Sequence, residues 1–309
     1  MLNNHWYILG AGAIGTLLSC MFQKANIQST LLVRTQLADH PNLTLVELDG
    51  SHQMIDLPTQ AINESSLPIT QLVLTTKAHQ SHQAMIDIQS RLCEGAIIIV
   101  MQNGMGVIET LTAKFPQYRI IAASTTEGAN RPTDNYLIHA GSGETWIGPF
   151  SINAPLPMLA LAQQIAGQWQ ALPMKVRYDP QINHRLWTKL AINCAINPLT
   201  VKYQCRNGEL LQNPHALSIM EDVCEELQCL MTAKQIPHNN DLFQIAKQVA
   251  LNTRTNISSM LQDHKNGRPT EIDYINGYVV SNGEALGISI EHNRQLVNTV
   301  RQDYKPLLG

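Results

Sequence analysis

One stretch of the chain carries polar side chains at a regular spacing. Lys189, Asn193 and Asn197 follow one another at intervals of four residues, which on an α-helix places one ammonium and two amides along a single face. Apolar residues flank this face, and Pro198 stops or kinks the helix directly after Asn197. A solvated helix face would explain the spacing alone, whereas the apolar flanks and a second amide-bearing turn at Asn207 favour a binding face. An ammonium among neutral amides can stabilise negative charge on a reacting carbonyl oxygen and then supply its proton.

A second group of polar residues follows nearer the C-terminus. Asn256 and Ser259 are predicted to lie one turn apart on a common helix face, where such mediocre helix formers need a reason to cluster. Thr270 is predicted to be the N-cap of the next helix, with Asp273 at its third position. Glu271 would then lie in the first turn, where the helix dipole alone favours a carboxylate. A structural role and a functional role therefore both stay open for Glu271.

A glycine-rich turn directly follows the first predicted strand and directly precedes a helical pattern. In this context GxGxxG is typical of a dinucleotide-binding loop. Gly10 would make the tight turn, Gly12 would let the backbone approach a pyrophosphate, and Gly15 would permit close packing of helix and strand. A purely structural turn is the alternative. The predicted cofactor-binding residues of this loop are Gly10, Ala11, Gly12, Ala13, Ile14 and Gly15.

The ends of later strands predict which nucleotide is bound. An NAD-binding protein places Asp or Glu at the end of the second strand, where it accepts a hydrogen bond from the ribose 2′-hydroxyl. This chain has Arg34 there, and a planar guanidinium suits a 2′-phosphate, so we predict NADP(H). A solvated strand-end cation is the alternative. Lys77 and Asn103 also follow predicted strands, and the carboxyl ends of strands in an open α/β sheet face the ligand.

Two periodicities divide the chain. The first half alternates short apolar runs with helical stretches, which predicts an α/β fold with a doubly wound parallel sheet. The second half repeats apolar residues every three or four positions, which predicts an all-helical C-terminal domain. With a boundary at Pro180, the nucleotide-binding domain covers residues 1–180 and the helical substrate and catalytic domain covers 181–309. Strands are predicted at Trp6–Leu9, Thr30–Val33, Leu72–Thr75, Ala96–Met101, Ile120–Ala123, Tyr136–Ala140 and Thr145–Gly148, and helices at Ala13–Lys24, His79–Leu92 and Gly106–Lys114.

Composition excludes several classes of protein. The 309 residues carry 21 Lys and Arg against 24 Asp and Glu, so the chain has no basic footprint for nucleic acid or anionic membranes. Its apolar runs fall short of the roughly 20 residues that a membrane helix needs, and no signal-peptide pattern opens the chain, so we expect a soluble, cytoplasmic protein. The 6 cysteines include no CxxC pair and the 11 histidines show no HExxH spacing. We therefore expect reduced thiols and no metal site.

Together these stretches closely resemble the ketopantoate reductases, the NADPH-dependent 2-dehydropantoate 2-reductases of pantothenate biosynthesis. No single motif decides the resemblance, but motifs spread over both halves in the family's order are specific. The resemblance implies an N-terminal Rossmann-type domain, a helical C-terminal domain and an active site in the cleft between them, with ketopantoate as the substrate. The matching stretches are Gly10–Gly15, Lys77, Asn103–Gly106, Leu186–Thr200, Asn207–Leu210, Asn256–Asp263 and Thr270–Gly277.

The resemblance also implies a role for each matching residue. Lys189 matches the proton donor. Glu271 matches a cleft residue associated with the cofactor, and it would also be able to orient Lys189 or bond the substrate hydroxyl. Arg34 and Lys77 match NADP-binding cations, and Ala129 falls where a cofactor-contacting backbone is expected. The implied substrate contacts are Asn103, which also touches the cofactor, Asn193, Asn197, Asn207 and Ser259, and the polar pattern adds Asn256.

Two other functions stay open. One alternative is a reductase of a related 2-keto acid, and the other is a non-catalytic NADP(H)-binding sensor with the same fold. A sensor needs only the N-terminal loop, so the presence of Lys189 together with Glu271 disfavours it. A dehydrogenase for a phosphorylated substrate would call for more cations than Lys189 and its amides offer. We expect a monomer or homodimer that acts on a small molecule and binds neither nucleic acid nor membrane.

Overall fold

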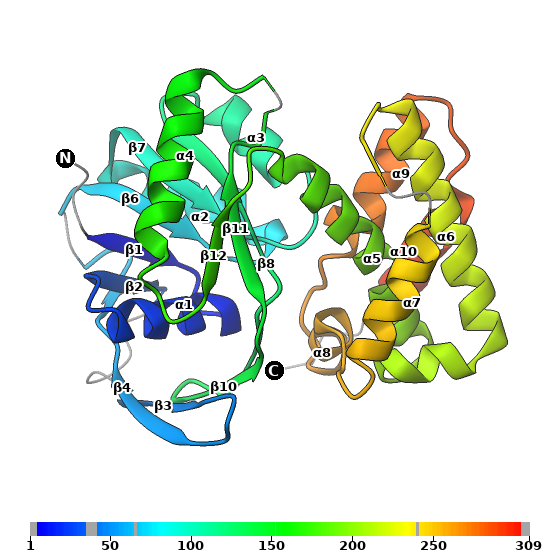
Figure 1. Ribbon diagram of the computed structural model, residues 1–309, viewed down its shortest axis with the longest axis horizontal. Helices are drawn as coiled ribbons and strands as arrows, with labels where there is room; N and C mark the ends of the chain where they lie inside the picture. The colour runs from blue at the N-terminus through cyan, green and yellow to red at the C-terminus, as the bar shows by residue number, and fades with distance from the viewer. Residues whose placement is uncertain (1–4, 35–41, 65–66, 152, 239–240, 304–309) are drawn as a thin grey trace. The chain divides into compact units, whose positions relative to one another are not determined.

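Two compact units make up the chain in the computed structural model (Figure 1). The first unit comprises Met1–Gln102 and Val107–Asn183, and the second comprises Asn103–Gly106 and His184–Gly309. The structure describes residues 5–34, 42–64, 67–151, 153–238 and 241–303. The division after Asn183 lies close to the expected boundary at 180. The short segment Asn103–Gly106 belongs to the helical unit, although its place in the sequence put it in the nucleotide-binding half.

An eight-stranded sheet forms the centre of the first unit, with the strand order β12-β11-β8-β7-β6-β1-β2-β5. Neighbouring strands are parallel except β11 and β8, which makes the sheet mixed at one side. The chain winds outward from β1 in both directions, so the predicted doubly wound arrangement is confirmed. The strands are β1 (Trp6–Leu9), β2 (Ser29–Val33), β5 (Thr59–Ala61), β6 (Ile69–Leu74), β7 (Leu92–Val100), β8 (Arg119–Thr125), β11 (Glu144–Gly148) and β12 (Lys175–Tyr178).

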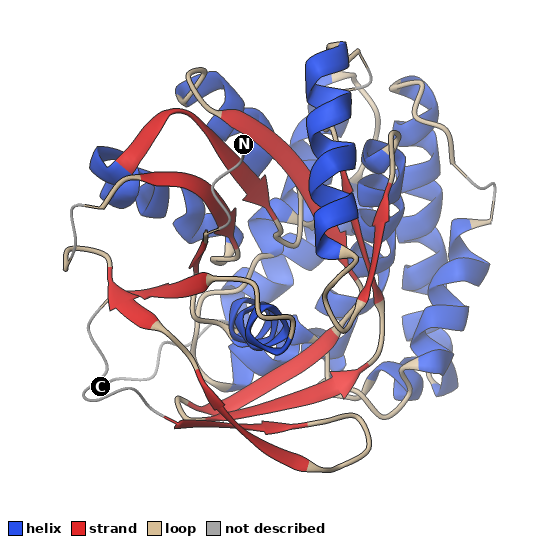
Figure 2. Ribbon diagram, turned by 60° about the vertical axis from the view of Figure 1, so that its left-hand side comes forward, coloured by secondary structure: helices blue, strands red, loops and turns tan. Residues whose placement is uncertain are grey.

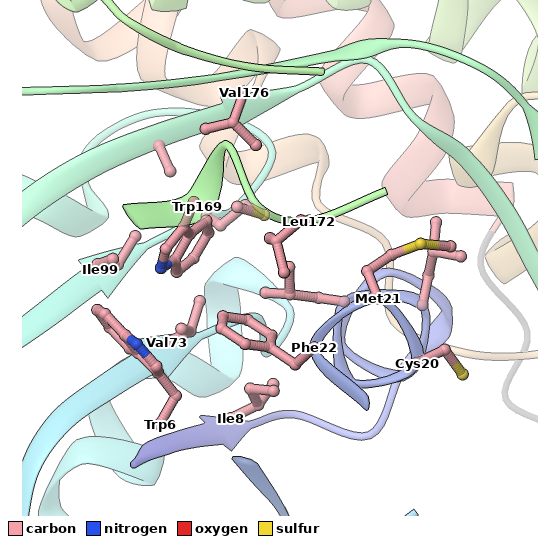
Figure 3. Packing of buried hydrophobic residues seen from close by; sticks show 14 of the residues in the cluster. Trp6, Ile8, Cys20, Met21, Phe22, Val73, Ile99, Trp169, Leu172 and Val176 are labelled. Carbon is pink, nitrogen blue, oxygen red and sulfur yellow. The ribbon is translucent and has the colours of Figure 1, made fainter. Parts of the chain in front are cut away.

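Helices α1 (Ala13–Lys24) and α4 (Leu156–Trp169) pack on one face of this sheet (Figure 3). Trp169 of α4 meets Trp6 of β1 and Phe22 of α1 edge to face, with ring centroids 5.3 and 5.2 Å away. Burial of these three rings holds α1 against β1, and therefore fixes the glycine-rich turn that joins them. Helices α2 (Ser81–Ile88) and α3 (Val107–Lys114) contact each other outside this core cluster, and α3 packs on β8.

A second sheet of four strands covers α1 from the other side. Its order is β4-β3-β10-β9, and both β9 and β10 contact α1. Only β10 was predicted. In β4, Ile55 is the single buried residue, and its exposed neighbours give no strand-like alternation. The bounds are β3 (Asn42–Val46), β4 (His52–Asp56), β9 (Gly128–Thr133) and β10 (Tyr136–Gly141).

The described part of the second unit contains helices and loops, whereas the strands (red) of both sheets belong to the first (Figure 2). The predicted helical C-terminal part is therefore confirmed. Helix α5 is buried near its middle, where Leu190, Cys194 and Leu199 are at most 1% exposed. The α-helices are α5 (Ile182–Tyr203), α6 (Pro214–Ala233), α7 (Leu242–Asn252), α8 (Ser259–Lys265), α9 (Asn276–Ala285) and α10 (Glu291–Asp303).

Two predicted details of this unit are wrong. The apolar pattern predicted one helix that carries both Asn256 and Ser259, but α7 ends at Asn252 and α8 begins at Ser259, so Asn256 lies in the loop between them. The side chain of Ser258 accepts the Leu261 N–H and starts α8 anew. Thr270 was predicted to be the N-cap of the next helix, but the next helical element is the short 3-10 helix η4 (Ile272–Tyr274), whose N-cap is Glu271, and α9 begins only at Asn276.

No helix among the described residues is long and apolar enough to cross a membrane. All six cysteines are free. Within the described ranges, no group of three or more His, Cys, Asp or Glu side chains is placed to hold a metal ion.

Candidate active site

The glycine-rich loop has the shape that each of its glycines predicts. Gly10 has a φ of +123°, and a Cβ there would stand 2.6 Å from the backbone nitrogen of Thr76. A Cβ on Gly15 would lie 2.0 Å from the carbonyl oxygen of Gly10. At Gly12, by contrast, a Cβ would have no other described atom within 4 Å. The loop is therefore tightly packed at both ends and open in the middle, where the N-terminus of α1 favours an anion such as a pyrophosphate.

Predicted cofactor-binding cations stand beside this loop at the carboxyl ends of neighbouring strands. Arg34 is exposed directly after β2, and Lys77 follows β6 at the start of the 3-10 helix η1 (Ala78–Gln80). Because β2 and β6 flank β1 in the sheet, both cations lie at the edge that carries Gly10. Thr75, directly after β6, links that strand to the glycine-rich loop, because its hydroxyl donates to the Gly10 carbonyl at 2.9 Å. The arrangement fits a bound dinucleotide.

Arg131 is a residue of this region that the sequence did not reveal. Its guanidinium lies on β9, its side chain is only 12% exposed, and its Nη1 donates to the carbonyl oxygen of Ala11 inside the loop. Burial lowers the pKa of this guanidinium, and Asp134, 3.4 Å away, opposes the shift. Ala129, on the same strand, is half-buried, pairs with His139 and packs against the core cluster. Prediction of β9 as a strand would have pointed to Arg131, because β9 contacts α1 and carries this largely buried cation.

The predicted polar face of the second unit lies on α5, as its spacing requires. Lys189 and Asn193 are partly exposed and Asn197 is buried. Burial lowers the pKa of the Lys189 ammonium to about 8, and the Glu271 carboxylate opposes that shift. Glu271 itself is 5% exposed at the start of η4. The structure thus brings an acidic and a basic side chain into electrostatic contact on a face lined with amides.

Asn103 is held in the same unit by the glycines that follow it. Gly104 has a φ of +80°, and a Cβ there would stand 2.4 Å from the carbonyl oxygen of Tyr274. The Met105 N–H donates to that same carbonyl at 2.8 Å. Only a glycine allows this approach, which fixes the Asn103 segment on the turn that begins with Glu271.

Asn207 begins the 3-10 helix η3 (Asn207–Gln212) and anchors the loop between α7 and α8. Its Nδ2 donates to Thr253 Oγ1 at 2.9 Å, and its backbone N–H donates to the Asn256 carbonyl at 3.0 Å. Its Oδ1 is buried, and no donor among the described residues reaches it. Asn207 therefore offers one free acceptor to a bound hydroxyl group.

Two neighbouring serines differ in what their hydroxyls do. The predicted contact Ser259 is exposed as the first residue of α8, whereas Ser258 is buried and lies 2.6 Å from Thr200 Oγ1. Thr200 donates in turn to the Asn197 carbonyl at 2.7 Å. Ser258, which no sequence motif marked, thus ties α8 to α5. Asn256 is exposed in its loop, where its backbone carbonyl accepts the Asn207 N–H and its own N–H donates to the Thr253 carbonyl at 2.8 Å.

A doubly wound sheet with a glycine-rich loop, followed by a helical unit with a lysine of lowered pKa, is the organisation of two-part dinucleotide-dependent oxidoreductases. Comparison with known proteins identifies the family. Residues 6–151 match the family described as ketopantoate reductase PanE/ApbA, and residues 181–304 match its C-terminal part. The chain belongs to the ketopantoate reductase family, as its motifs predicted.

Individual relatives agree with this assignment. The chain is 34% identical over 295 residues to a 2-dehydropantoate 2-reductase of Vibrio cholerae serotype O1, which covers 95% of this chain and 96% of the relative. It resembles the crystal structure of a PanE/ApbA family ketopantoate reductase from Ralstonia eutropha JMP134, with a TM-score of 0.86, 24% identity and coverage of 97% and 98%. It also resembles D-mandelate dehydrogenase in a ternary structure with NADH and anilino(oxo)acetate, with a TM-score of 0.88, 23% identity and the same coverage. These two solved structures share the fold of the chain.

Proposed function

We propose that this chain reduces 2-dehydropantoate (ketopantoate) to (R)-pantoate with NADPH, as a cytoplasmic monomer or homodimer in pantothenate biosynthesis. The observation that carries the proposal is Lys189, a lysine whose pKa is lowered to about 8 beside Glu271 on an amide-bearing helix. An ammonium whose pKa is lowered in this way is suited to give a proton to a forming alkoxide.

Lys189 performs the proton transfer in this proposal. The bound cofactor supplies hydride from nicotinamide C4 to the C2 carbonyl carbon of the keto acid. Lys189 Nζ donates a hydrogen bond to the carbonyl oxygen, stabilises the negative charge that develops there, and passes its proton to that oxygen. The neutral amine is then reprotonated from solvent, and Glu271 favours that reprotonation because its charge raises the pKa of Lys189.

Neutral groups hold the substrate in this proposal. Amides and hydroxyls can bind a carboxylate and a hydroxyl without a second cation that would compete with Lys189 for the substrate's charge. Asn207 supports this role because its buried Oδ1 is open to a donor such as a substrate hydroxyl. The proposed substrate contacts are Asn103, Asn193, Asn197, Asn207, Asn256 and Ser259.

NADP(H) is the proposed cofactor. Gly10–Gly15 would bind the pyrophosphate. Arg34 and Lys77 would bind the end of the cofactor that carries the 2′-phosphate. Other parts of the cofactor would contact Asn103, Ala129 and Glu271. What supports NADP(H) over NAD(H) is that an exposed guanidinium stands where an acidic residue would otherwise receive the ribose hydroxyl.

One assay tests the proposal against its rivals. NADPH oxidation is followed by absorbance with ketopantoate and with a panel of other α-keto acids, and NADH serves as the cofactor control. Turnover confined to ketopantoate with NADPH is the expected result. Faster turnover of another keto acid would assign a related reductase, and nucleotide binding without turnover of any substrate would favour a sensor.

A further inference from the structure

Pro198 lies inside α5, the helix that carries Lys189, Asn193 and Asn197. Proline has no backbone N–H, so the carbonyl of the residue four positions earlier, Cys194, has no intrahelical donor. Cys194 is 0% exposed, so water cannot take the place of that donor. A buried carbonyl without a partner would cost stability and leave the helix free to bend at this point.

Asn276, the first residue of α9, supplies the missing donor. Its Nδ2 donates to the Cys194 carbonyl at 3.2 Å and also to Asn293 Oδ1 at 2.9 Å. Asn276 and Asn293 are both 0% exposed. Both amide protons of Asn276 are therefore used inside the protein, and one of them serves the carbonyl that Pro198 leaves open.

Glu226 of α6 fixes the other end of this network. Its carboxylate accepts from Asn293 Nδ2 at 2.7 Å, and it also accepts the backbone N–H groups of His292 at 2.7 Å and Asn293 at 3.0 Å. These bonds cap α10 and orient the Asn293 amide so that its oxygen faces Asn276. Helices α6, α10 and α9 are thus joined by hydrogen bonds to the proline break in α5.

We propose that Asn276 is a positioning residue for the reaction. By holding α5 at its proline break, Asn276 keeps Lys189 and Asn193, which precede Cys194, in a fixed orientation to Asn197, which lies within the break between Cys194 and Pro198. The inference rests on the proposed function of the α5 face, because it assigns Asn276 a role through that face and not through contact with the substrate.

A double-mutant cycle on stability tests the physical link without any assay of activity. Pro198→Ala provides an N–H at residue 198 that can donate to the Cys194 carbonyl. Asn276→Ala should lower the Tm by about 3–10 °C in the natural chain, as expected for a buried acceptor left unsatisfied. In the Pro198→Ala background the loss should be less than half as large, since only the bond to Asn293 is then removed. Equal losses in the two backgrounds would overturn the proposal.

Asn282→Ala is the matched control for this cycle. Asn282 lies on the same helix, donates from Nδ2 to the Tyr278 carbonyl at 2.8 Å and has no bond to α5 among the described residues. Its substitution should cost the same in both backgrounds. If Asn276→Ala alone does not fold, the double variant decides, because the proposal requires that Pro198→Ala restores folding.

Activity then separates positioning from simple stabilisation. At a temperature where circular dichroism shows each variant to be fully folded, Asn276→Ala should lower kcat about 10-fold or more, as misplacement of reacting groups does. Its Kd for NADPH should stay within about twofold, because the nucleotide loop lies in the other unit. A folded Asn276→Ala variant with the kcat of the natural chain overturns the positioning role. Absence of turnover in the natural chain would instead refute the proposed function, and the stability cycle would still test the link between Asn276 and Pro198.

Discussion

A lysine that acts as proton donor must meet two requirements, and the surroundings of Lys189 meet both. It must be charged to stabilise an oxyanion, and it must release its proton readily once that oxyanion has formed. Burial lowers the pKa of Lys189 to about 8, while the Glu271 charge keeps it from falling further. The sequence pointed to this lysine through its spacing from the two amides and its apolar neighbours. It left three roles open for Glu271, because contact between residues 189 and 271 depends on tertiary packing.

Substitution of Glu271 should change the pH dependence of the reaction. Lys189 can donate only when it is protonated, so kcat/KM for reduction should be level below about pH 8 and fall above it. Glu271→Gln removes the charge that raises the pKa of Lys189, so the falling limb should move to lower pH. Glu284→Gln, an exposed carboxylate on α9, is the control and should leave the limb in place. An unmoved limb in Glu271→Gln would contradict the electrostatic link between the two residues.

Arg34 should decide between the two nicotinamide cofactors. Arg34→Asp replaces a cation with the acidic residue that receives a ribose 2′-hydroxyl, so NADPH binding should weaken about 10- to 100-fold, as loss of a charge-assisted hydrogen bond predicts. NADH binding should weaken much less or improve. Fluorescence titration of both cofactors measures the ratio. If both affinities fell by the same factor, Arg34 would have no role at the 2′-phosphate.

At the scale of elements, local signals were reliable where they were strong. The predicted bounds of β1 and α1 match the structure, because an apolar run, three glycines and a helical period follow one another without interruption. Strands β3, β4 and β9 were not predicted, because they owe their order to pairing with each other and with β10 and not to their own sequence patterns. The break between α7 and α8 was missed because apolar spacing continues across a serine cap. Sequence periodicity thus revealed the inner strands of the sheet that carries the loop, but missed its edge strands β5 and β12 and all of the second sheet except β10.

That second sheet should contribute to nucleotide binding through Arg131. A trans peptide directs its C=O and the following N–H to opposite sides, so the bond from Arg131 to the Ala11 carbonyl also orients the Gly12 N–H. Arg131→Met should therefore weaken NADPH binding about 10-fold and leave the KM for the keto acid within about twofold. Arg119→Met is the matched control, because Arg119 donates to the Gly95 carbonyl in an exposed position away from the loop. Equal NADPH affinities in the two variants would refute this role.

At the scale of the whole molecule, the chain passes into the helical unit twice. Asn103–Gly106 belongs to that unit although the residues on both sides of it belong to the first. The sequence placed Asn103 correctly at a strand end, but it gave no sign of the contact between Gly104 and Tyr274, which are 170 positions apart in the chain. The order of motifs along the chain was enough to predict the family and the two-part fold, whereas this crossing could be seen only in three dimensions.

Gly104→Ala should test the importance of this crossing. Both Gly104 and Gly50 have a φ near +80°, but a Cβ at residue 104 would clash with the Tyr274 carbonyl, whereas one at residue 50 would have no described neighbour within 4 Å. Gly50→Ala should cost about 1–2 kcal/mol from backbone strain alone. Gly104→Ala should destabilise the protein by more than that in chemical denaturation and also lower kcat, since Asn103 is displaced. Equal costs for the two variants would contradict the close approach.

Lys189 is the proton donor in the proposed reaction, and the kcat of a Lys189→Ala variant measures that role. Lys202→Ala, which removes an exposed lysine from the same helix, is the matched control. With ketopantoate and saturating NADPH, Lys189→Ala should lower kcat about 100- to 10,000-fold, the usual contribution of general acid catalysis, with NADPH affinity unchanged. Lys202→Ala should keep the kcat of the natural chain. A Lys189→Ala variant that turns over ketopantoate as fast as the natural chain would show that Lys189 is not the proton donor.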